Sequence, residues 1–207
     1  MPDPAALHNA YAADYDAQVA AYESYIAEAL FGLAYDFVRP GERLLDVGIG
    51  SGLAAAPFAH AGLRVSGMDF AAAMLDLCRA KGLADDLRQH DLQRTPWPYA
   101  AAFDHAICCG VFHFVPALAG PFGETRRVLR PGGVFAFTTK WPDTPLPLGA
   151  PFTRVAAGEL DVFSHAPEYV IAELEAAGFA RLRLLRCFVG QDVFGVWVAR
   201  RGAGEPQ

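Results

Sequence analysis

Between residues 42 and 140, short apolar runs alternate with segments long enough to form helices. The five strand-like runs are ERLLDV, LRVSGMDF, DLRQHDL, FDHAICCGVF and VFAFTTK. Consecutive strands that are joined through a helix run parallel, because a right-handed crossover returns the chain to the same edge of the sheet. The sequence therefore predicts an α/β fold, in which helices cover both faces of a parallel sheet.

The end of the chain departs from this alternation. PEYVIAELEAAGF has helical periodicity and leads into ARLRLLRCFV, and only GQD separates that run from VFGVWVAR. Three residues are too few for a parallel crossover, so the last two strands are predicted to form an antiparallel hairpin. The segment at 140–151, KWPDTPLPLGAP, is predicted to be a proline-rich loop within the domain.

The first forty residues carry apolar side chains at steps of three and four, which predicts one amphipathic helix or two helices in line. RPG at 39–41 is expected to end this helical part, because proline disfavours helix in the residue before it. We expect residues 1–39 to form a helical lid or cap, residues 40–200 to form one domain, and residues 201–207 to be a flexible tail.

Composition and charge exclude several classes of function. The net charge is −6, and no lysine- or arginine-rich run is dense enough to follow phosphates, so no nucleic-acid partner is expected. The most apolar window, AICCGVFHFVPALAGPF, is broken by a histidine and two prolines, so no membrane span is expected. None of the four cysteines forms a C-x-x-C pair. We expect free thiols, no metal, and a cytoplasmic monomer or homodimer.

LLDVGIGSG, at residues 44–52, is the segment most suggestive of a binding site. It ends an apolar strand on Asp46 and places Gly48, Gly50 and Gly52 at alternate positions before a helix. Glycines there let a ligand approach the backbone, and the amides at a helix N-terminus favour negative charge. A dinucleotide fingerprint, G-x-G-x-x-G, would need glycine where Leu53 stands. Leu53 and Asp46 therefore argue against a nicotinamide oxidoreductase.

This segment resembles the first motif of the class I S-adenosylmethionine-dependent methyltransferases of the small-molecule type. VSGMDF is similar to the second motif of that family and QHDLQRTPWP to the third. FDHAICCGVFHFV and RVLRPGGVFAFTT are similar to the fourth strand and to the entry into the fifth. The resemblance covers about residues 40 to 200. It implies a Rossmann-like, seven-stranded doubly wound sheet with an antiparallel strand from the C-terminal hairpin, and an N-terminal helical lid.

The resemblance also implies S-adenosyl-L-methionine as cofactor and S-adenosyl-L-homocysteine as product. It assigns Asp69 to the ribose hydroxyls, and it assigns Asp91 and the backbone amide of Leu92 to the adenine. The cofactor-binding residues it implies are Asp46, Gly48, Gly50, Gly52, Asp69, Phe70, Met74, Asp91, Leu92, Cys109 and Gly110. Without the resemblance, the two aspartates at strand ends would be interpreted as turn formers and Met74 as core packing.

His113 follows the fourth strand and is a candidate general base if the acceptor must lose a proton. The alternative is a structural histidine in the aromatic cluster from Phe112 to Phe114. Further candidates for contact with substrate, or for the lid, are Tyr11, Tyr15, Trp141, Phe163 and His165. For the tyrosines the alternative is the buried stripe of a helix, which is favoured for Tyr22. For His165 it is a capping or surface position.

The aromatic residues near the predicted site indicate a small methyl acceptor that is partly apolar or aromatic. The leading hypothesis is thus methyl transfer from S-adenosyl-L-methionine to a small molecule. A catalytically inactive S-adenosylmethionine-binding partner or sensor of the same fold is the alternative, since a fold does not guarantee an activity.

Overall fold

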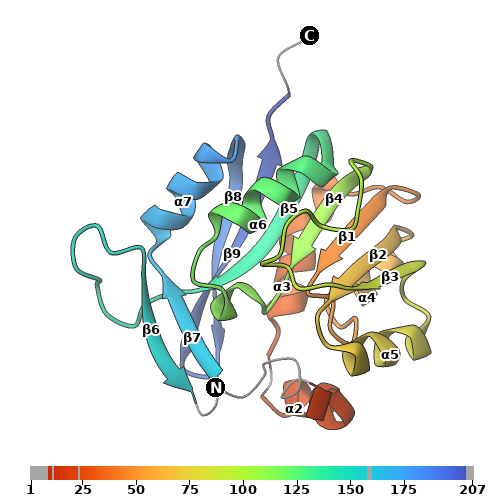
Figure 1. Cartoon of the computed structure of the whole chain (residues 1–207), viewed down its shortest axis with the longest axis horizontal. Helices are drawn as coiled ribbons and strands as arrows, with labels where there is room; N and C mark the ends of the chain where they lie inside the picture. The colour runs from red at the N-terminus through yellow and green to blue at the C-terminus, as the bar shows by residue number, and fades with distance from the viewer. Residues whose placement is uncertain (1–8, 11, 23, 158–159, 204–207) are drawn as a thin grey trace.

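The computed structural model describes residues 9–10, 12–22, 24–157 and 160–203. At its centre is a seven-stranded sheet in the order β3-β2-β1-β4-β5-β9-β8 (Figure 1). The strands are β1 (Arg43–Val47), β2 (Arg64–Asp69), β3 (Asp86–Gln89), β4 (Phe103–Cys108), β5 (Leu129–Lys140), β8 (Phe179–Val189) and β9 (Asp192–Arg201). β1 to β5 are parallel, whereas β9 is antiparallel to both β5 and β8. This confirms the predicted fold class and the C-terminal hairpin.

Helices cover both faces of the sheet, as the alternation predicts. The helical elements are η1 (Ala12–Asp14), α2 (Tyr15–Ala21), α3 (Ile26–Ala34), η2 (Tyr35–Phe37), α4 (Ala56–His60), α5 (Ala72–Lys81), η3 (Phe112–Phe114), α6 (Ala119–Val128) and α7 (Pro167–Ala176). On one face, α6 and α7 pack on Leu45 and Phe135. On the other, α3, α4 and α5 pack on Leu44 and Val134. Adjacent residues of one strand thus pack into the cores on opposite faces of the sheet, because side chains alternate across a strand.

The strand order reverses at β1, which has β2 on one side and β4 on the other. From β1 the chain moves outward to β2 and β3, and it then crosses back to β4 and continues in the opposite direction. In open α/β sheets this reversal leaves a crevice at the carboxyl ends of the strands on either side of it. The loops that follow β1 and β4 meet at this crevice, so the strand order determines where a ligand site can form.

The N-terminal part differs from the predicted continuous stripe. α2 ends at Ala21, and α3 begins only at Ile26 and packs on the sheet beside β8 and β9. Tyr22 lies in the turn between the two helices and is 73% exposed, so its predicted place in a buried stripe is wrong. Among the described residues, none of the helices combines the length and the apolar run that a membrane crossing requires.

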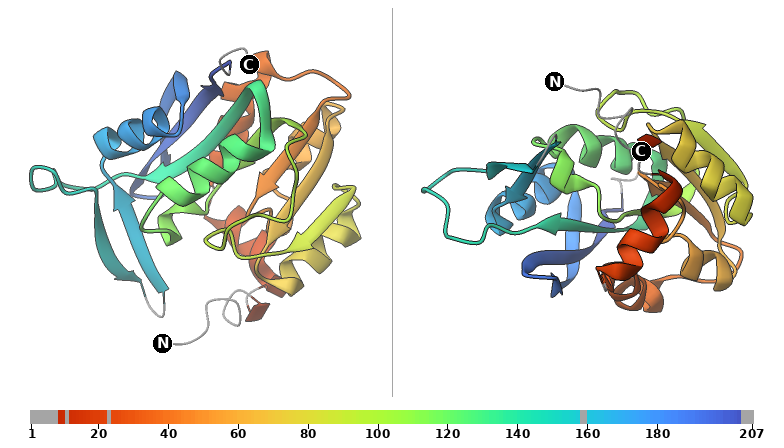
Figure 2. Two further views of the ribbon diagram at one scale, coloured as in Figure 1. Left: turned by 45° about the horizontal axis from the view of Figure 1, so that its top comes forward. Right: turned by 90° about the horizontal axis from the view of Figure 1, so that it is seen from below.

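Two strands that the sequence reading missed follow β5. β6 (Phe152–Ala157) and β7 (Leu160–His165) pair antiparallel in a separate small sheet. The β6–β7 hairpin lies beside the main sheet, at the same end of the sheet as α2 (Figures 1 and 2). The segment PGG, at residues 131–133, forms an irregularity within β5.

Gly67, in the middle of β2, lies directly beneath the glycine-rich loop. A Cβ atom there would meet Ile49 Cδ1 at 2.5 Å and Ile49 Cβ at 2.9 Å. We expect Gly67→Ala to lower the free energy of unfolding by roughly 1–3 kcal/mol, the usual cost of overpacking. Gly32→Ala is the control, because Gly32 is exposed in α3 with no atom within 4 Å of its would-be Cβ.

Urea unfolding of both variants tests this expectation. Alanine is a better helix former than glycine, so Gly32→Ala is expected to stabilise the protein by up to about 1 kcal/mol. Equal stability of Gly67→Ala and the wild type would contradict the packing described here.

Candidate active site

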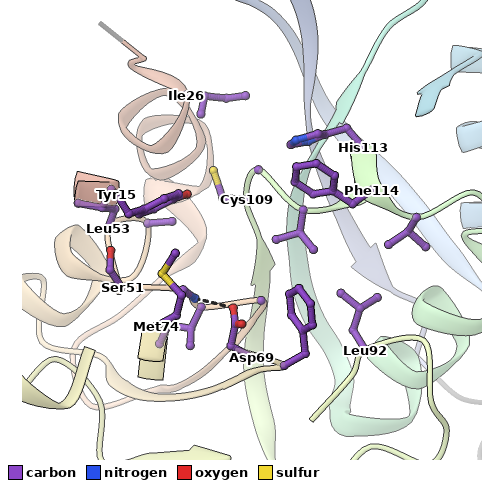
Figure 3. Close-up of a pocket in the computed structure, with 18 of the residues that line it drawn as sticks. Tyr15, Ile26, Ser51, Leu53, Asp69, Met74, Leu92, Cys109, His113 and Phe114 are labelled. Atoms are coloured by element: carbon purple, nitrogen blue, oxygen red, sulfur yellow. Dashed lines mark hydrogen bonds between the residues drawn. The ribbon is translucent and has the colours of Figure 1, made fainter. Parts of the chain in front are cut away.

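A cavity of about 930 Å³ opens at the carboxyl ends of β1, β2 and β4 (Figure 3). This is within the range of small-molecule sites, about 300–1,000 Å³. We call the part lined by Gly48, Gly50, Asp69 and Met74 the loop half. The aromatic half, on the other side of the cavity, is lined by Ile26, His113, Phe114, Leu160, Phe163 and Phe194.

Asp69, at the end of β2, fixes the geometry of the loop half. Its Oδ2 accepts a hydrogen bond from Gly50 N at 2.9 Å, and its Oδ1 accepts one from Ala71 N at 2.9 Å. The carboxylate thereby joins the glycine-rich loop to the start of α5, which is the turn-forming role considered from the sequence. An ionised carboxylate has about four lone-pair sites, so two backbone hydrogen bonds are compatible with acceptance from the hydroxyls of a ligand.

The three glycines of the loop have different roles. Gly48 and Gly50 have φ values of +76° and +54°, a backbone region that favours glycine. No atom lies within 4 Å of a Cβ built on Gly50, whereas a Cβ on Gly48 would meet Val111 Cγ2 at 2.5 Å. A Cβ on Gly52 would meet Cys78 Sγ at 3.0 Å. Gly52 therefore permits packing on α5 and does not itself line the cavity, contrary to its predicted binding role.

Asp46 lies beneath this loop and is almost fully buried, without lining the cavity. Neither of its carboxyl oxygens has a hydrogen-bond partner in the described part of the chain. Burial, and then the negative charge of Asp69, hold the pKa of Asp46 well above its ordinary value. A buried carboxyl of this kind favours its neutral form unless a cation lies close by.

The other residues predicted for the cofactor line the cavity: Phe70, Met74, Asp91, Leu92, Cys109 and Gly110. Asp91 also forms a turn, because its Oδ1 accepts from Gln93 N at 2.9 Å. Cys109 is not an activated nucleophile, since burial and then the charge of Asp46 raise the pKa of its thiol.

The N-terminal helix α2 closes one side of the cavity. Tyr15 lines it (Figure 3), and burial and the neighbouring acidic groups raise its pKa to about 12, so its phenol is neutral at physiological pH. Asp16 accepts from Ser51 Oγ in the glycine-rich loop at 2.5 Å and also pairs with Lys81 of α5. Asn9 Oδ1 accepts from Ala73 N at 3.0 Å.

Asp16 and Asn9 are the residues of the loop half that sequence reasoning missed. Their partners lie 35 and 64 positions further along the chain. The local sequence does not predict such contacts, because a polar residue on a helix is usually exposed to solvent. Tyr11, which was predicted alongside Tyr15, lies outside the described residues.

His113 belongs to the aromatic half, on the side opposite Asp69 and Met74 (Figure 3). Its ring centroid lies 4.0 Å from that of Phe114 and 5.6 Å from that of Phe194. The imidazole therefore faces the cavity beside two rings, of which only Phe114 belongs to the predicted cluster, because Phe112 is fully buried in the core. Phe163 lines the cavity from β7, and its contact with substrate stays a prediction.

Two predicted substrate residues lie elsewhere. His165 is fully buried, and its Nε2 donates to the Val115 carbonyl at 2.9 Å. Burial lowers its pKa, so it is a neutral structural residue that joins β7 to the segment after η3, and it is neither a cap nor a surface group. Trp141 packs near Trp197 and borders a separate cavity of about 410 Å³ together with Arg186.

The sheet order, the glycine-rich loop and the acid after β2 define a Rossmann-like protein that binds a nucleotide-type ligand. A family model for a methyltransferase domain matches residues 45–137, which extend from β1 into β5. Malonyl-[acyl-carrier protein] O-methyltransferase from Serratia marcescens is 32% identical over 175 residues. The match covers 84% of this chain and 61% of that protein.

Solved structures show the same fold. 1,6-Didemethyltoxoflavin-N1-methyltransferase from Burkholderia thailandensis, with bound 1,6-didemethyltoxoflavin and S-adenosylhomocysteine, superposes with a TM-score of 0.72 at 21% identity. The superposition covers 95% of this chain and 87% of that one. The [4+2]-cyclase SpnF superposes with a TM-score of 0.70 at 19% identity, covering 86% of this chain and 82% of that one.

The chain is thus similar to methyltransferases in two ways: residues 45–137 match a methyltransferase domain, and the fold is that of solved S-adenosylmethionine-dependent methyltransferases. It spans between a third and three fifths of the length of the curated relatives it matches. The matched region contains the glycine-rich loop, Asp69, Asp91 and His113, and it excludes β6, β7 and the N-terminal helices. The family match therefore concerns the loop half much more than the aromatic half.

The burial of Asp46 predicts a pH-dependent cost to stability. A carboxyl whose pKa is higher in the folded chain stabilises the fold fully below its unfolded pKa and loses that contribution as the pH rises through the folded pKa. Asn at this position carries no charge, so we expect Asp46→Asn to be more stable than the wild type at neutral pH. The difference should shrink in acid, where Asp46 is protonated in both states.

Urea unfolding at neutral and at acidic pH measures this difference. Asp76→Asn, at an exposed position of α5, is the control. A stability difference between Asp46→Asn and the wild type that does not change with pH would contradict the assignment.

Proposed function

We propose that this chain is an S-adenosyl-L-methionine-dependent methyltransferase that methylates a small, partly apolar or aromatic acceptor. The observation that carries the proposal is the bridge from Asp69 to Gly50 and Ala71, which presents a carboxylate and an open backbone to one half of the cavity. The other half is apolar and aromatic. A cofactor half joined to an acceptor half is the arrangement that a two-substrate transfer requires.

The residues of the loop half suit the proposed cofactor. Asp69 would hold the ribose hydroxyls, because an ionised carboxylate accepts from two donors at once. Asp91 and Leu92 would hold the adenine, with Phe70 and Met74 as its apolar walls. The buried, unpartnered carboxyl of Asp46 suits a neighbouring ammonium, which would compensate the charge that burial otherwise disfavours.

When bound, the cofactor supplies an electrophilic methyl group on a sulfonium. The chain's own contribution is to hold the two reactants in line and to exclude water. Tyr15 and α2 cover the loop half, and Phe114, Phe163 and Phe194 enclose the acceptor. His113, between these rings, would accept a proton from a hydroxyl or amine acceptor whose nucleophilicity depends on losing it.

Asp69 gives the first test of cofactor binding. We expect Asp69→Ala to weaken binding of S-adenosyl-L-homocysteine by roughly 10- to 100-fold, because hydrogen bonds to a charged group are worth about 1.5–3 kcal/mol. Isothermal titration calorimetry measures this loss, with Asp76→Ala as the control for removal of an acid outside the cavity. Undiminished affinity of Asp69→Ala would refute the ribose assignment.

His113 gives the test of catalysis, with an acceptor that turns over in a screen against labelled cofactor. We expect His113→Ala to keep its affinity for S-adenosyl-L-homocysteine and to lower kcat by roughly 100-fold or more. His60→Ala, at the exposed end of α4, is the control. Unchanged kcat would mean that His113 is only structural. Cofactor binding without any turnover would favour the alternative, an inactive cofactor-binding partner or sensor.

A further inference from the structure

The cavity is lined by more acids than strong bases. Arg94 is the one lysine or arginine that lines it within the described residues, whereas Asp69, Asp91 and Asp161 all line it. The residues outside the described ranges contain no lysine or arginine in the sequence, so they bring no further basic side chain. An anionic acceptor would thus meet few positive partners.

The arginine that lines the cavity and an arginine of the β6–β7 hairpin already have carboxylate partners. Arg94 Nε lies 3.7 Å from Asp91 Oδ2, on the segment after β3. The second arginine, Arg154, is the register partner of Phe163 in the β6–β7 hairpin, so the two side chains share a face. Its guanidinium lies 2.8 Å from Asp161 Oδ1. Asp161 therefore neutralises the positive charge of Arg154, which is paired across the hairpin with Phe163 of the aromatic half.

We propose that the acceptor site selects uncharged acceptors over carboxylates, and that Asp161 determines this preference by occupying Arg154. The inference rests on the proposed methyl transfer, and it adds the charge of the acceptor. A carboxylate placed against Phe114, Phe163 and Phe194 would lose its water without gaining the guanidinium of Arg154, which Asp161 holds. Burying an ion without a partner costs far more than burying a neutral group of the same shape.

The charges in and beneath the loop half also disfavour an anionic acceptor. Asp69 is buried there, and Asp46 lies beneath the loop. The phenol of Tyr15 responds to both acids, since its pKa is raised to about 12 chiefly by burial and further by neighbouring acidic groups. A carboxylate bound in this cavity would be disfavoured by the same burial and the same acidic groups.

His113 is the other group of the aromatic half that is able to bear positive charge. Asp161→Asn leaves the rings and His113 in place, removes one negative charge from the cavity lining and frees the guanidinium of Arg154. A carboxylate held by His113 would gain from the lost charge whether or not Arg154 is present, whereas one held by the freed Arg154 would gain only while Arg154 is present. Substitution of Asp161 alone and together with Arg154 thus separates the two possibilities.

The experiment compares two ligands of matched shape, 2-naphthamide and 2-naphthoate, on the full chain saturated with S-adenosyl-L-homocysteine. Ligand-detected NMR titration at neutral pH gives both dissociation constants. We expect the wild type to bind the amide about tenfold or more tighter than the carboxylate, the usual scale for an unpaired buried ion. Asp161→Asn frees Arg154 and is expected to reduce this ratio severalfold by improving carboxylate binding.

Two further variants complete the design. Asp161→Asn combined with Arg154→Gln removes the freed cation, so the wild-type preference should return, and this also controls for any damage to the hairpin. Asp192→Asn is the matched control, because Asp192 pairs with Lys140 and does not line the cavity. It is expected to leave the ratio unchanged.

Three results would overturn the inference: equal or tighter binding of the carboxylate by the wild type, a ratio insensitive to Asp161→Asn, or no binding of either ligand. Binding of S-adenosyl-L-homocysteine is measured first. If it fails, the proposed methyltransferase function falls as well. If it succeeds and the ratio is absent, only the charge preference of the acceptor site falls.

Discussion

The carboxylate of Asp69 is the interaction on which the site depends. With one oxygen on Gly50 N and the other on Ala71 N, it joins the loop after β1 to the helix after β2. Three consecutive elements of the fold are thereby fixed at one point, next to the reversal of strand order. Burial chiefly, and the charge of Asp69 in addition, raise the pKa of Asp46 and of Tyr15, so this side chain contributes to both the shape and the electrostatics of the loop half.

The two halves of the cavity have different origins in the chain. The loop half comes from residues 48–92, a continuous stretch that follows β1, β2 and β3 in order. The aromatic half is assembled from separate segments, namely the start of α3, η3, the β6–β7 hairpin and β9. The continuous half combines backbone amides with the side chains of a few local residues, whereas the assembled half is defined by side chains from distant segments. The proposed cofactor and acceptor contacts therefore come from different parts of the chain.

This division explains what the sequence predicted. The loop half was largely predicted, because its glycines and strand-end acids are local and lie between a strand and a helix. Gly52 shows the limit, since spacing could not tell a glycine that faces a cavity from one that faces Cys78. Tyr22 and His165 were misjudged because their burial depends on where a turn or a distant strand lies. The β6–β7 hairpin was missed behind a proline-rich loop, although two alternating runs separated by Gly158 and Glu159 were a usable signal.

The N-terminal segment covers one side of the cavity. Asp16 and Asn9 attach it to the glycine-rich loop and to α5, while Tyr15 forms part of the wall. Beside these polar contacts, Ala12 and Tyr15 take part in only a small apolar cluster with Ala71 and Met74. The core contacts of α3 are apolar and extensive by comparison. Opening for ligand exchange should therefore involve η1 and α2, while α3 stays on the sheet. The same hydrogen bonds that shield the loop half from water then also limit how fast a bound ligand leaves.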